Sequence, residues 1–344
     1  MNNVDNLYLK SGYLNVPWIE EITDKNNISF IIIVGSRQIG KTYGVLKLML
    51  EEDRRFILMR RTQTEVNFLT NIALNPFANL DSDIIIKKDS DFTARIDKIT
   101  DDMSNQIGMV TSLKGIAKIR GFNGRVFSDL VYDEFIPENH VVRIKDEGDA
   151  FINAIITISG NRELEGEKPL KCWMLANANN INNPVLEKMN VQIKLNDMIR
   201  KKQEFSILKD KGIMLINAAG EAVINKRKQT AIYKAVDTES EVMKMAFGNE
   251  FSYNDSENVK KEDLKQFNPV LDVFNSFSIW KSKHDGHYYV YKSKQMPKVF
   301  NNNDRGRKEL LKYMGNIKNL YYLNKITFYD LILKEKFKSF IDVN

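Results

Sequence analysis

The stretch Ile31–Leu50, IIIVGSRQIGKTYGVLKLML, decides how the first half of the chain folds. Gly35, Gly40, Lys41 and Thr42 fit the pattern G-x-x-x-x-G-K-[ST], with an apolar β-branched run before it and a helical pattern after it. Such a loop needs glycine because its backbone N–H groups must turn inward around phosphate oxygens, and the N-terminal end of the following helix adds positive partial charge there. The stretch therefore predicts a strand, a phosphate-binding loop and a helix.

The expected ligands of this loop are ATP and Mg²⁺. Lys41 would neutralise the β- and γ-phosphates, and the Thr42 hydroxyl would be a ligand of the metal. The loop residues predicted to hold the nucleotide are Gly35, Ser36, Arg37, Gln38, Ile39, Gly40, Lys41 and Thr42.

A second acidic element lies further along, in SDLVYDEF (Ser128–Phe135). Asp133 ends an apolar strand pattern and is predicted to hold Mg²⁺, while Glu134 is predicted to polarise the attacking water. A carboxylate base beside a metal ligand favours water as the acceptor of the phosphoryl group, which predicts a nucleoside triphosphatase.

Short apolar runs alternate with helical stretches from residue 28 to residue 176, which predicts an α/β fold. Continuous rather than alternating apolar character marks strands that are covered on both faces, as in a mostly parallel sheet of the RecA/ASCE-like P-loop type. Between the second and third runs, DIIIKKDSDFTARIDKITDD and QIGMVTSL predict antiparallel hairpins. The single cysteine, Cys172, cannot form an internal disulfide and is predicted to be an inert core residue. The predicted strand runs are ISFIIIV (28–34), RFILM (55–59), DLVYD (129–133) and LKCWMLA (170–176).

The 344 residues divide unevenly in charge. Residues 1–195 carry 24 basic and 26 acidic side chains, whereas residues 196–344 carry 27 and 19. A basic patch favours polyanionic partners. We predict an ATPase domain at 1–195, a charged, helix-prone linker subdomain at 196–260 and a basic C-terminal domain at 261–344, in which two alternating strands flank a turn at Asp285-Gly286.

Composition excludes several classes of protein. Hydrophobic residues make up 43% and charged residues 28%, which is ordinary for a globular chain and rules out disorder throughout. No window approaches the roughly 20 apolar residues that a membrane span needs, and the first residues, MNNVDNLYLK, lack the pattern of a signal peptide. We therefore expect an intracellular protein with no membrane partner.

At this point the sequence resembles a family. SRQIGKT (36–42), with Arg37 two residues after the first glycine, resembles the phosphate loop of viral DNA-packaging motors, the large terminases and their smaller relatives. FILMRR (56–61), VYDEFI (131–136) and LANAN (175–179) are similar to the short packaging ATPases of small short-tailed phages with protein-primed linear genomes. The resemblance implies ATP-driven translocation of double-stranded DNA into a procapsid by a homo-oligomeric ring, a pentamer by analogy. It further implies docking on a portal protein in the host cytoplasm, with a packaging RNA as an additional partner.

The resemblance also implies residue roles. Arg37 would sense the γ-phosphate in cis, and Asn177 would report the phosphate state to the rest of the subunit. A ring ATPase completes its site with a basic residue from a neighbouring subunit, because charge develops on the γ-phosphoryl oxygens. Arg120 and Arg162 are both candidates for that trans arginine. Further positions are Pro17 and Trp18 around the adenine, and Lys114, Lys118 and Arg125 along the DNA.

Large terminases carry a C-terminal nuclease of RNase H-like fold, which needs several carboxylates around two metal ions. The later acids of this chain, Asp272, Asp285, Asp304 and Asp330, are sparse, and His284 and His287 fit ordinary hairpin positions. We therefore predict a vestigial RNase H-like α+β domain that touches DNA, RNA or the portal without cutting.

Three other functions remain open from the sequence. A helicase or other RecA-like motor would share the phosphate loop and the acidic pair. A small-molecule kinase would share the loop, but Glu134 and the lack of an arginine-rich lid speak against it. A binding module without catalysis would leave Glu134 without a role.

Overall fold

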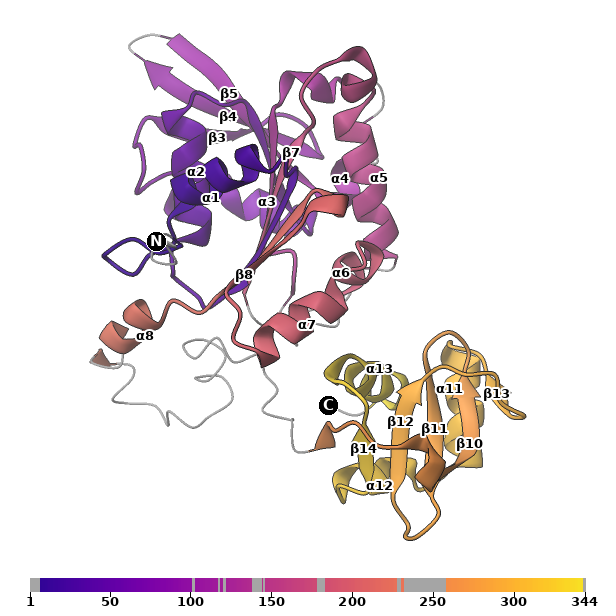
Figure 1. Cartoon of the computed structure of the whole chain (residues 1–344). Coiled ribbons are helices and arrows are strands. Elements are labelled where there is room, and N and C mark those ends of the chain that lie inside the picture. The colour runs from indigo at the N-terminus through magenta and orange to yellow at the C-terminus, as the bar shows by residue number, and fades with distance from the viewer. Residues whose placement is uncertain are drawn as a thin grey trace. The chain divides into compact units, whose positions relative to one another are not determined.

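The computed structural model describes two compact units, Met1–Ser252 and Tyr253–Asn344 (Figure 1). Among the helices of the residues that it describes, none combines the length and the apolar character that crossing a membrane requires. The described residues are 7–100, 103–116, 118–119, 122–137, 144, 146–177, 183–227, 230–231 and 258–342.

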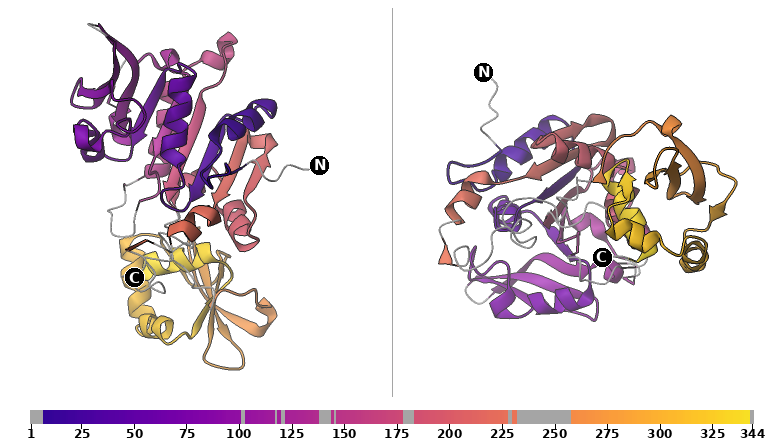
Figure 2. Two further views of the ribbon diagram at one scale, coloured as in Figure 1. Left: turned by 90° about the vertical axis from the view of Figure 1, so that its left-hand side faces the viewer. Right: turned by 90° about the horizontal axis from the view of Figure 1, so that it is seen from below.

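The N-terminal unit is built on a nine-stranded sheet in the order β3-β4-β5-β2-β6-β7-β1-β9-β8 (Figures 1 and 2). Its six central strands run parallel, and β3, β4 and β8 are antiparallel to their neighbours. The strands are β1 (Phe30–Gly35), β2 (Phe56–Arg60), β3 (Ile84–Lys88), β4 (Thr93–Thr100), β5 (Met103–Ser112), β6 (Asp129–Asp133), β7 (Lys171–Asn177), β8 (Phe205–Leu208) and β9 (Ile213–Ala218).

The four predicted apolar runs are all strands of this sheet, and the predicted antiparallel excursion is confirmed as β3, β4 and β5. β7 lies between β1 and β6. The carboxyl ends of the phosphate-loop strand and of the acidic strand therefore flank the end of β7. Cys172, on β7, is fully buried, and burial raises the pKa of its thiol well above the usual value, as expected of an unreactive core residue.

Helices cover both faces of the sheet, which explains why its strands are apolar without interruption. Alternate side chains of β1 point to opposite faces: Ile31 and Ile33 pack with the first group of helices, and Ile32 and Val34 with the second. The first group is α1 (Val16–Lys25), α2 (Lys41–Glu51) and α3 (Gln63–Leu69), and the second is α4 (Leu113–Ile116), α5 (Glu147–Ser159), α6 (Pro184–Lys188) and α7 (Gln192–Arg200). The unit also contains α8 (Glu221–Arg227) and 3-10 helices at Ile72–Leu74, Gly124–Val126, Arg162–Glu165 and Lys209–Lys211.

The predicted end of the ATPase domain at residue 195 is wrong. β9 pairs in parallel with β1 over its whole length, from Phe30↔Ile213 to Gly35↔Ala218, so the sheet extends to residue 218. The apolar run of β9 is short and has charged residues on both sides. Such a pattern is also typical of a linker, and for this reason the sequence predicts one there. Residues 232–257, which belong to the predicted linker subdomain, lie outside the described residues.

The C-terminal unit is an α+β domain, as predicted. Its five-stranded sheet has the order β13-β10-β11-β12-β14, and the predicted hairpin is confirmed as β11 and β12, with the Asp285 carboxylate accepting a hydrogen bond from the backbone N–H of His287 in the turn. Its elements are a 3-10 helix (Leu264–Gln266), β10 (Phe267–Val273), β11 (Phe277–Ser282), β12 (Tyr288–Lys292), β13 (Val299–Phe300), α11 (Asp304–Tyr313), α12 (Ile317–Tyr322), β14 (Ile326–Phe328) and α13 (Leu331–Ile341).

Candidate active site

The phosphate loop leaves the sheet at Gly35, where only glycine fits. A Cβ at this position would lie 2.2 Å from the carbonyl oxygen of Ala218 on the neighbouring strand β9. The loop then turns through Gln38 and Gly40, whose φ angles of 59° and 85° lie in the left-handed region, and α2 begins at Lys41. The sequence thus produces the strand, loop and helix predicted from its glycines.

Lys41 is buried and points back into the loop. Its ammonium donates to the carbonyl oxygens of Gly35 at 3.3 Å and Ser36 at 2.6 Å, and to the side-chain oxygen of Asn177 at 3.1 Å. Asn177 is opposite Gly35 in the register of β7 with β1. The predicted coupling residue therefore contacts the predicted phosphate-binding lysine directly.

The metal-ligand candidates Thr42 and Asp133 also lie together. The Thr42 hydroxyl donates to Oδ1 of Asp133 at 3.0 Å, although 91 residues separate them in the sequence. Asp133 is buried at the end of β6, and its Oδ1 also accepts from the backbone N–H of Glu134 at 3.1 Å. The paired alcohol and carboxylate at this helix N-terminus are oxygen ligands of the kind that Mg²⁺ takes in proteins.

Sequence reasoning missed the role of Arg60, at the end of β2. Its guanidinium lies 2.9 Å from Oδ2 of Asp133 and 2.7 Å from Oε2 of Glu134, so it holds both acids of the site. Glu134 has a φ of 55°, in the left-handed region, and its side chain is 58% exposed. A non-glycine residue in that region is uncommon and concentrates at functional sites. The sequence shows a pair of arginines at the end of an apolar run, but only the structure places that strand beside the acidic strand.

These residues surround one cavity of about 320 Å³. Backbone N–H groups at the start of α2, a buried lysine and a threonine–aspartate pair suit a triphosphate with its magnesium ion. Tyr43, which is 49% exposed, is a lining residue that the sequence analysis did not single out. The full lining is Arg37, Gln38, Gly40, Lys41, Thr42, Tyr43, Asp133, Glu134, Ala176 and Asn177.

The comparison with protein families agrees with this geometry. The model of the podovirus DNA encapsidation protein (Gp16) family matches residues 10–335, nearly the whole chain. The chain belongs to that family. Its function is therefore ATP-driven packaging of phage DNA, as the resemblance implied.

Two solved structures with a similar fold are of packaging motors. The Phi-29 viral genome packaging motor assembly is similar to the encapsidation protein over 98% of this chain and 99% of that chain, with a TM-score of 0.62 and 15% identity. The Phi-28 gp11 DNA packaging motor matches over 94% of this chain and 97% of that chain, with a TM-score of 0.54 and 17% identity. A search of curated proteins gave no match.

The trans-arginine prediction for Arg162 does not fit the structure. The side chain is only 3% exposed, and its guanidinium donates to four backbone carbonyls, those of Gly124, Phe127, Ile158 and Ser159. Burial also lowers its pKa. A trans arginine has to reach the phosphate in a neighbouring subunit. The Arg162 guanidinium is buried and already donates to carbonyls of its own chain, so it is not placed for that role. Arg120, the other candidate, lies outside the described residues.

The other positions predicted from the sequence do not line the nucleotide cavity. Trp18 packs edge-on against Phe205, with ring centroids 5.6 Å apart, and neither Trp18 nor Pro17 lines the cavity. Lys118 lies over the ring of Phe92, and Arg125 pairs with Glu165. Lys114 lines a separate cavity of about 260 Å³ together with Lys118.

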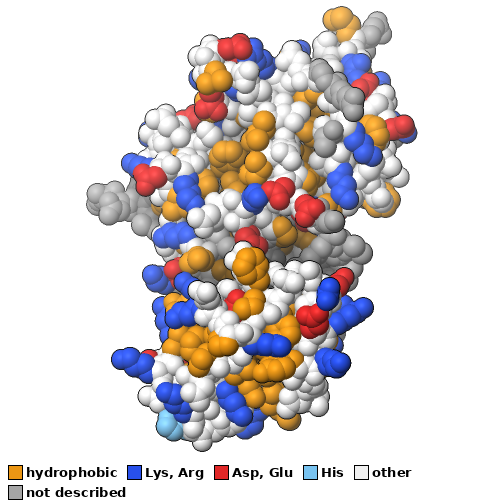
Figure 3. Space-filling model, turned by 90° about the vertical axis from the view of Figure 1, so that its right-hand side faces the viewer, with side chains coloured by type: hydrophobic (Ala, Val, Ile, Leu, Met, Phe, Trp, Pro, Cys, Tyr) orange, Lys and Arg blue, Asp and Glu red, His pale blue; other side chains and the backbone are white. Residues whose placement is uncertain are grey.

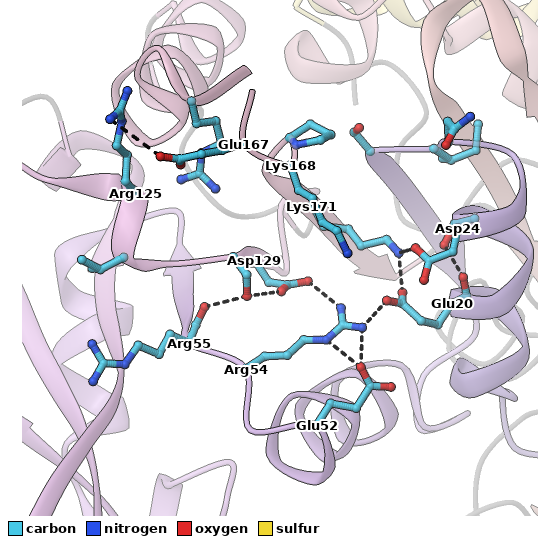
Figure 4. Close-up of a pocket in the computed structure, with 18 of the residues that line it drawn as sticks. Glu20, Asp24, Glu52, Arg54, Arg55, Arg125, Asp129, Glu167, Lys168 and Lys171 are labelled. Carbon is cyan, nitrogen blue, oxygen red and sulfur yellow. Dashed lines mark hydrogen bonds and ion pairs between the residues drawn. The ribbon is translucent and has the colours of Figure 1, made fainter. Parts of the chain in front are cut away.

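A larger cavity, of about 990 Å³, lies at the opposite edge of the sheet, where β2, β6 and β7 begin (Figure 4). Arg54 contacts Asp129 at 3.1 Å and pairs with Glu20 of α1, and Lys171 lies 2.8 Å from Glu20. Burial alone would lower the pKa of Arg54, but Asp129 and Glu20 raise it above its usual value. These acidic and basic side chains are paired with one another, and the ion pairs connect α1 to the starts of the strands.

Proposed function

We propose that this encapsidation protein hydrolyses ATP in the cavity around Lys41 and uses the energy to move double-stranded DNA. The observation that carries the proposal is the convergence of Lys41 and Thr42 from one segment, and Asp133 and Glu134 from another, on one cavity. A phosphate-binding module without catalysis would have no use for an exposed glutamate beside the metal-ligand pair.

Each residue has a defined task in this proposal. Lys41 and Arg37 bind the phosphates, and Thr42 and Asp133 hold Mg²⁺, which when bound supplies positive charge to the phosphate oxygens. Glu134 orients the attacking water and accepts its proton. In the structure Arg60 pairs with both Glu134 and Asp133, and it thereby holds the base beside the proposed metal ligands.

Asn177 is proposed to link the nucleotide to the rest of the subunit. Its side-chain oxygen accepts a hydrogen bond from Lys41. When Lys41 moves to bind phosphate, this hydrogen bond changes, and the position of Asn177 at the end of β7 changes with it. Since β7 lies between the phosphate-loop strand and the acidic strand, it contacts both halves of the site.

The assembly that we propose is a ring of identical subunits, a pentamer by analogy, docked on the portal in the host cytoplasm. The similar structures are those of a packaging motor and of a packaging motor assembly. Arg120 is the proposed trans residue, on its position before the acidic strand. A packaging RNA is a further partner by the same analogy.

The C-terminal unit is proposed to contact nucleic acid or the portal without cutting. Within the part of the chain that the structure describes, no group of three or more His, Cys, Asp or Glu side chains is arranged to hold a metal ion. Asp272, a buried acid of this sheet, accepts hydrogen bonds from Ser293 and from the backbone of Lys294. Incubation of plasmid DNA with the protein and Mg²⁺ or Mn²⁺ should leave the plasmid intact, and specific cutting would overturn this part of the proposal.

The ATPase rate with and without duplex DNA, over a range of salt concentrations, tests the proposal. Duplex DNA should stimulate hydrolysis, and the stimulation should fall steeply with salt, because the grip is on phosphates. Unwinding of forked substrates with a preference for single strands would favour a helicase. Phosphate release only in the presence of an acceptor metabolite would favour a kinase.

A further inference from the structure

The sheet of the C-terminal unit has one face packed against its α-helices and a second face that is covered only in part: Tyr289 is buried there, and the backbone N–H of Glu262 donates to its hydroxyl. In β11 and β12 the side chains of Phe277, Ile279 and Val290 point to the helices, and the ring of Phe277 packs 5.6 Å from that of Phe337 on α13. Because side chains alternate along a strand, the residues between them point to the other face. Trp280 lies opposite Tyr289 on that face.

This second face carries the partly exposed rings of Trp280 and Tyr291, and the partly exposed ring of Tyr329, just after β14, joins them; we call these three rings the aromatic face. Tyr291 and Tyr329 meet edge-on with centroids 4.9 Å apart. The indole N–H of Trp280 donates to the hydroxyl of Ser278 at 2.8 Å, which fixes the ring on the strand. These contacts fix the orientation of the rings on the sheet.

Lysines lie above these rings. The ammonium of Lys294 is 5.7 Å from the centroid of Trp280 and 5.3 Å from that of Tyr291. Lys292 and Lys261 lie 5.3 Å and 5.7 Å from the centroid of Tyr329. All three lysines are exposed, and among residues 258–342 none of their ammonium groups has a carboxylate within ion-pair distance.

A ligand for this surface needs flat apolar groups for the rings and negative charge for the lysines. Unpaired nucleotides offer both, since each base has a face to stack and each linkage a phosphate. A duplex offers its phosphates but keeps its bases stacked inside. The surroundings favour a polyanion as well, because residues 281–340 carry 14 basic and 5 acidic side chains, and Figure 3 shows Lys and Arg interspersed with hydrophobic side chains on the C-terminal unit.

We propose that the aromatic face binds unpaired nucleotides of a nucleic acid strand, which stack on Trp280, Tyr291 and Tyr329 while the lysines move from the rings to the phosphates. This activity is separate from ATP hydrolysis and from the grip on duplex DNA. It gives the C-terminal unit a ligand of defined chemistry.

Fluorescence anisotropy with the full chain, without nucleotide, tests this proposal. The probes are a short labelled single strand, as RNA and as DNA of one sequence, and the matching duplex. Trp280→Leu should weaken binding of the single strand by about tenfold, which is within the range for loss of one stacked base. The double variant Lys292→Gln/Lys294→Gln should weaken it as well and reduce the slope of log affinity against log salt by about 1.4, because two phosphate contacts are lost.

Matched controls on the helices separate this effect from general loss of aromatic or basic surface. Tyr322→Leu, at a side chain that is 63% exposed on α12, and the double variant Lys308→Gln/Lys312→Gln on α11 should change the affinity by less than about twofold. Equal weakening of RNA and DNA supports recognition of bases and phosphates, and stronger binding of RNA supports an added contact to the 2′-hydroxyl.

Unchanged affinity in both test variants would overturn the proposal. So would a test variant that weakens duplex binding as much as single-strand binding. Because the assay contains no ATP, neither result would bear on the proposed ATPase.

Discussion

Replacing Arg162 by methionine tests whether this arginine is part of the core or acts on a neighbouring subunit. Its donors reach the carbonyl oxygens of Gly124 and Phe127 at 3.0 Å, of Ser159 at 3.1 Å and of Ile158 at 3.2 Å. These bonds join the end of α5 to the segment that leads into β6. Methionine fills a similar volume but leaves all four carbonyls without this donor.

The expected loss of stability is about 3 kcal/mol. Each carbonyl that loses a charged donor costs roughly 1 kcal/mol, and the gain from no longer burying a guanidinium offsets part of the sum. In a unit of this size, about 3 kcal/mol lowers Tm by roughly 6 to 12 °C. Calorimetry or circular dichroism during heating measures the shift.

Arg55→Met is the matched control, because the Arg55 side chain is exposed; it should move Tm by less than about 2 °C. Rings mixed from Arg162→Met and wild-type subunits provide the opposing test. If Arg162→Met keeps the wild-type Tm but abolishes hydrolysis in those mixed rings, the trans role stands and the structural account of this residue is wrong.

Three further substitutions probe the nucleotide site. Lys41→Met should weaken ATP binding about a hundredfold, measured by calorimetric titration, because a charged donor to the phosphates is lost; binding within a fewfold of wild type would exclude Lys41 as the phosphate lysine. Arg60→Gln should lower kcat about tenfold with little change in ATP affinity, since Glu134 loses the partner that holds it, and an unchanged kcat would make the ion pair incidental. Gly35→Ala should lower Tm by several degrees, because the new Cβ meets the Ala218 carbonyl at 2.2 Å; an unchanged Tm would mean that β1 and β9 separate freely there.

The sequence predicted the parts of the site that depend on local order. The phosphate loop is one contiguous motif, and Asp133, Glu134 and Asn177 follow directly from the ends of apolar strands. Since the carboxyl ends of neighbouring parallel strands share one edge of a sheet, knowing the strands was enough to bring these residues together.

The remaining features depend on contacts between distant segments. Arg162 stands in a polar stretch that reads as a surface loop, and its burial is set by carbonyls up to 38 residues away. Strand β9 pairs with β1, which lies more than 180 residues earlier in the sequence. A short apolar run does not by itself predict such a distant partner. Arg60 was visible as a basic residue, but its role came only from the position of β2 beside β6.

The hydrolytic role of Glu134 is the central claim, and Glu134→Gln tests it most directly. The glutamine keeps the size of the side chain but cannot accept a proton from water. The variant should bind ATP and Mg²⁺ with an affinity close to that of the wild type, while the duplex-stimulated rate of phosphate release falls by about a hundredfold or more. Phosphate release at the wild-type rate in Glu134→Gln would contradict the account.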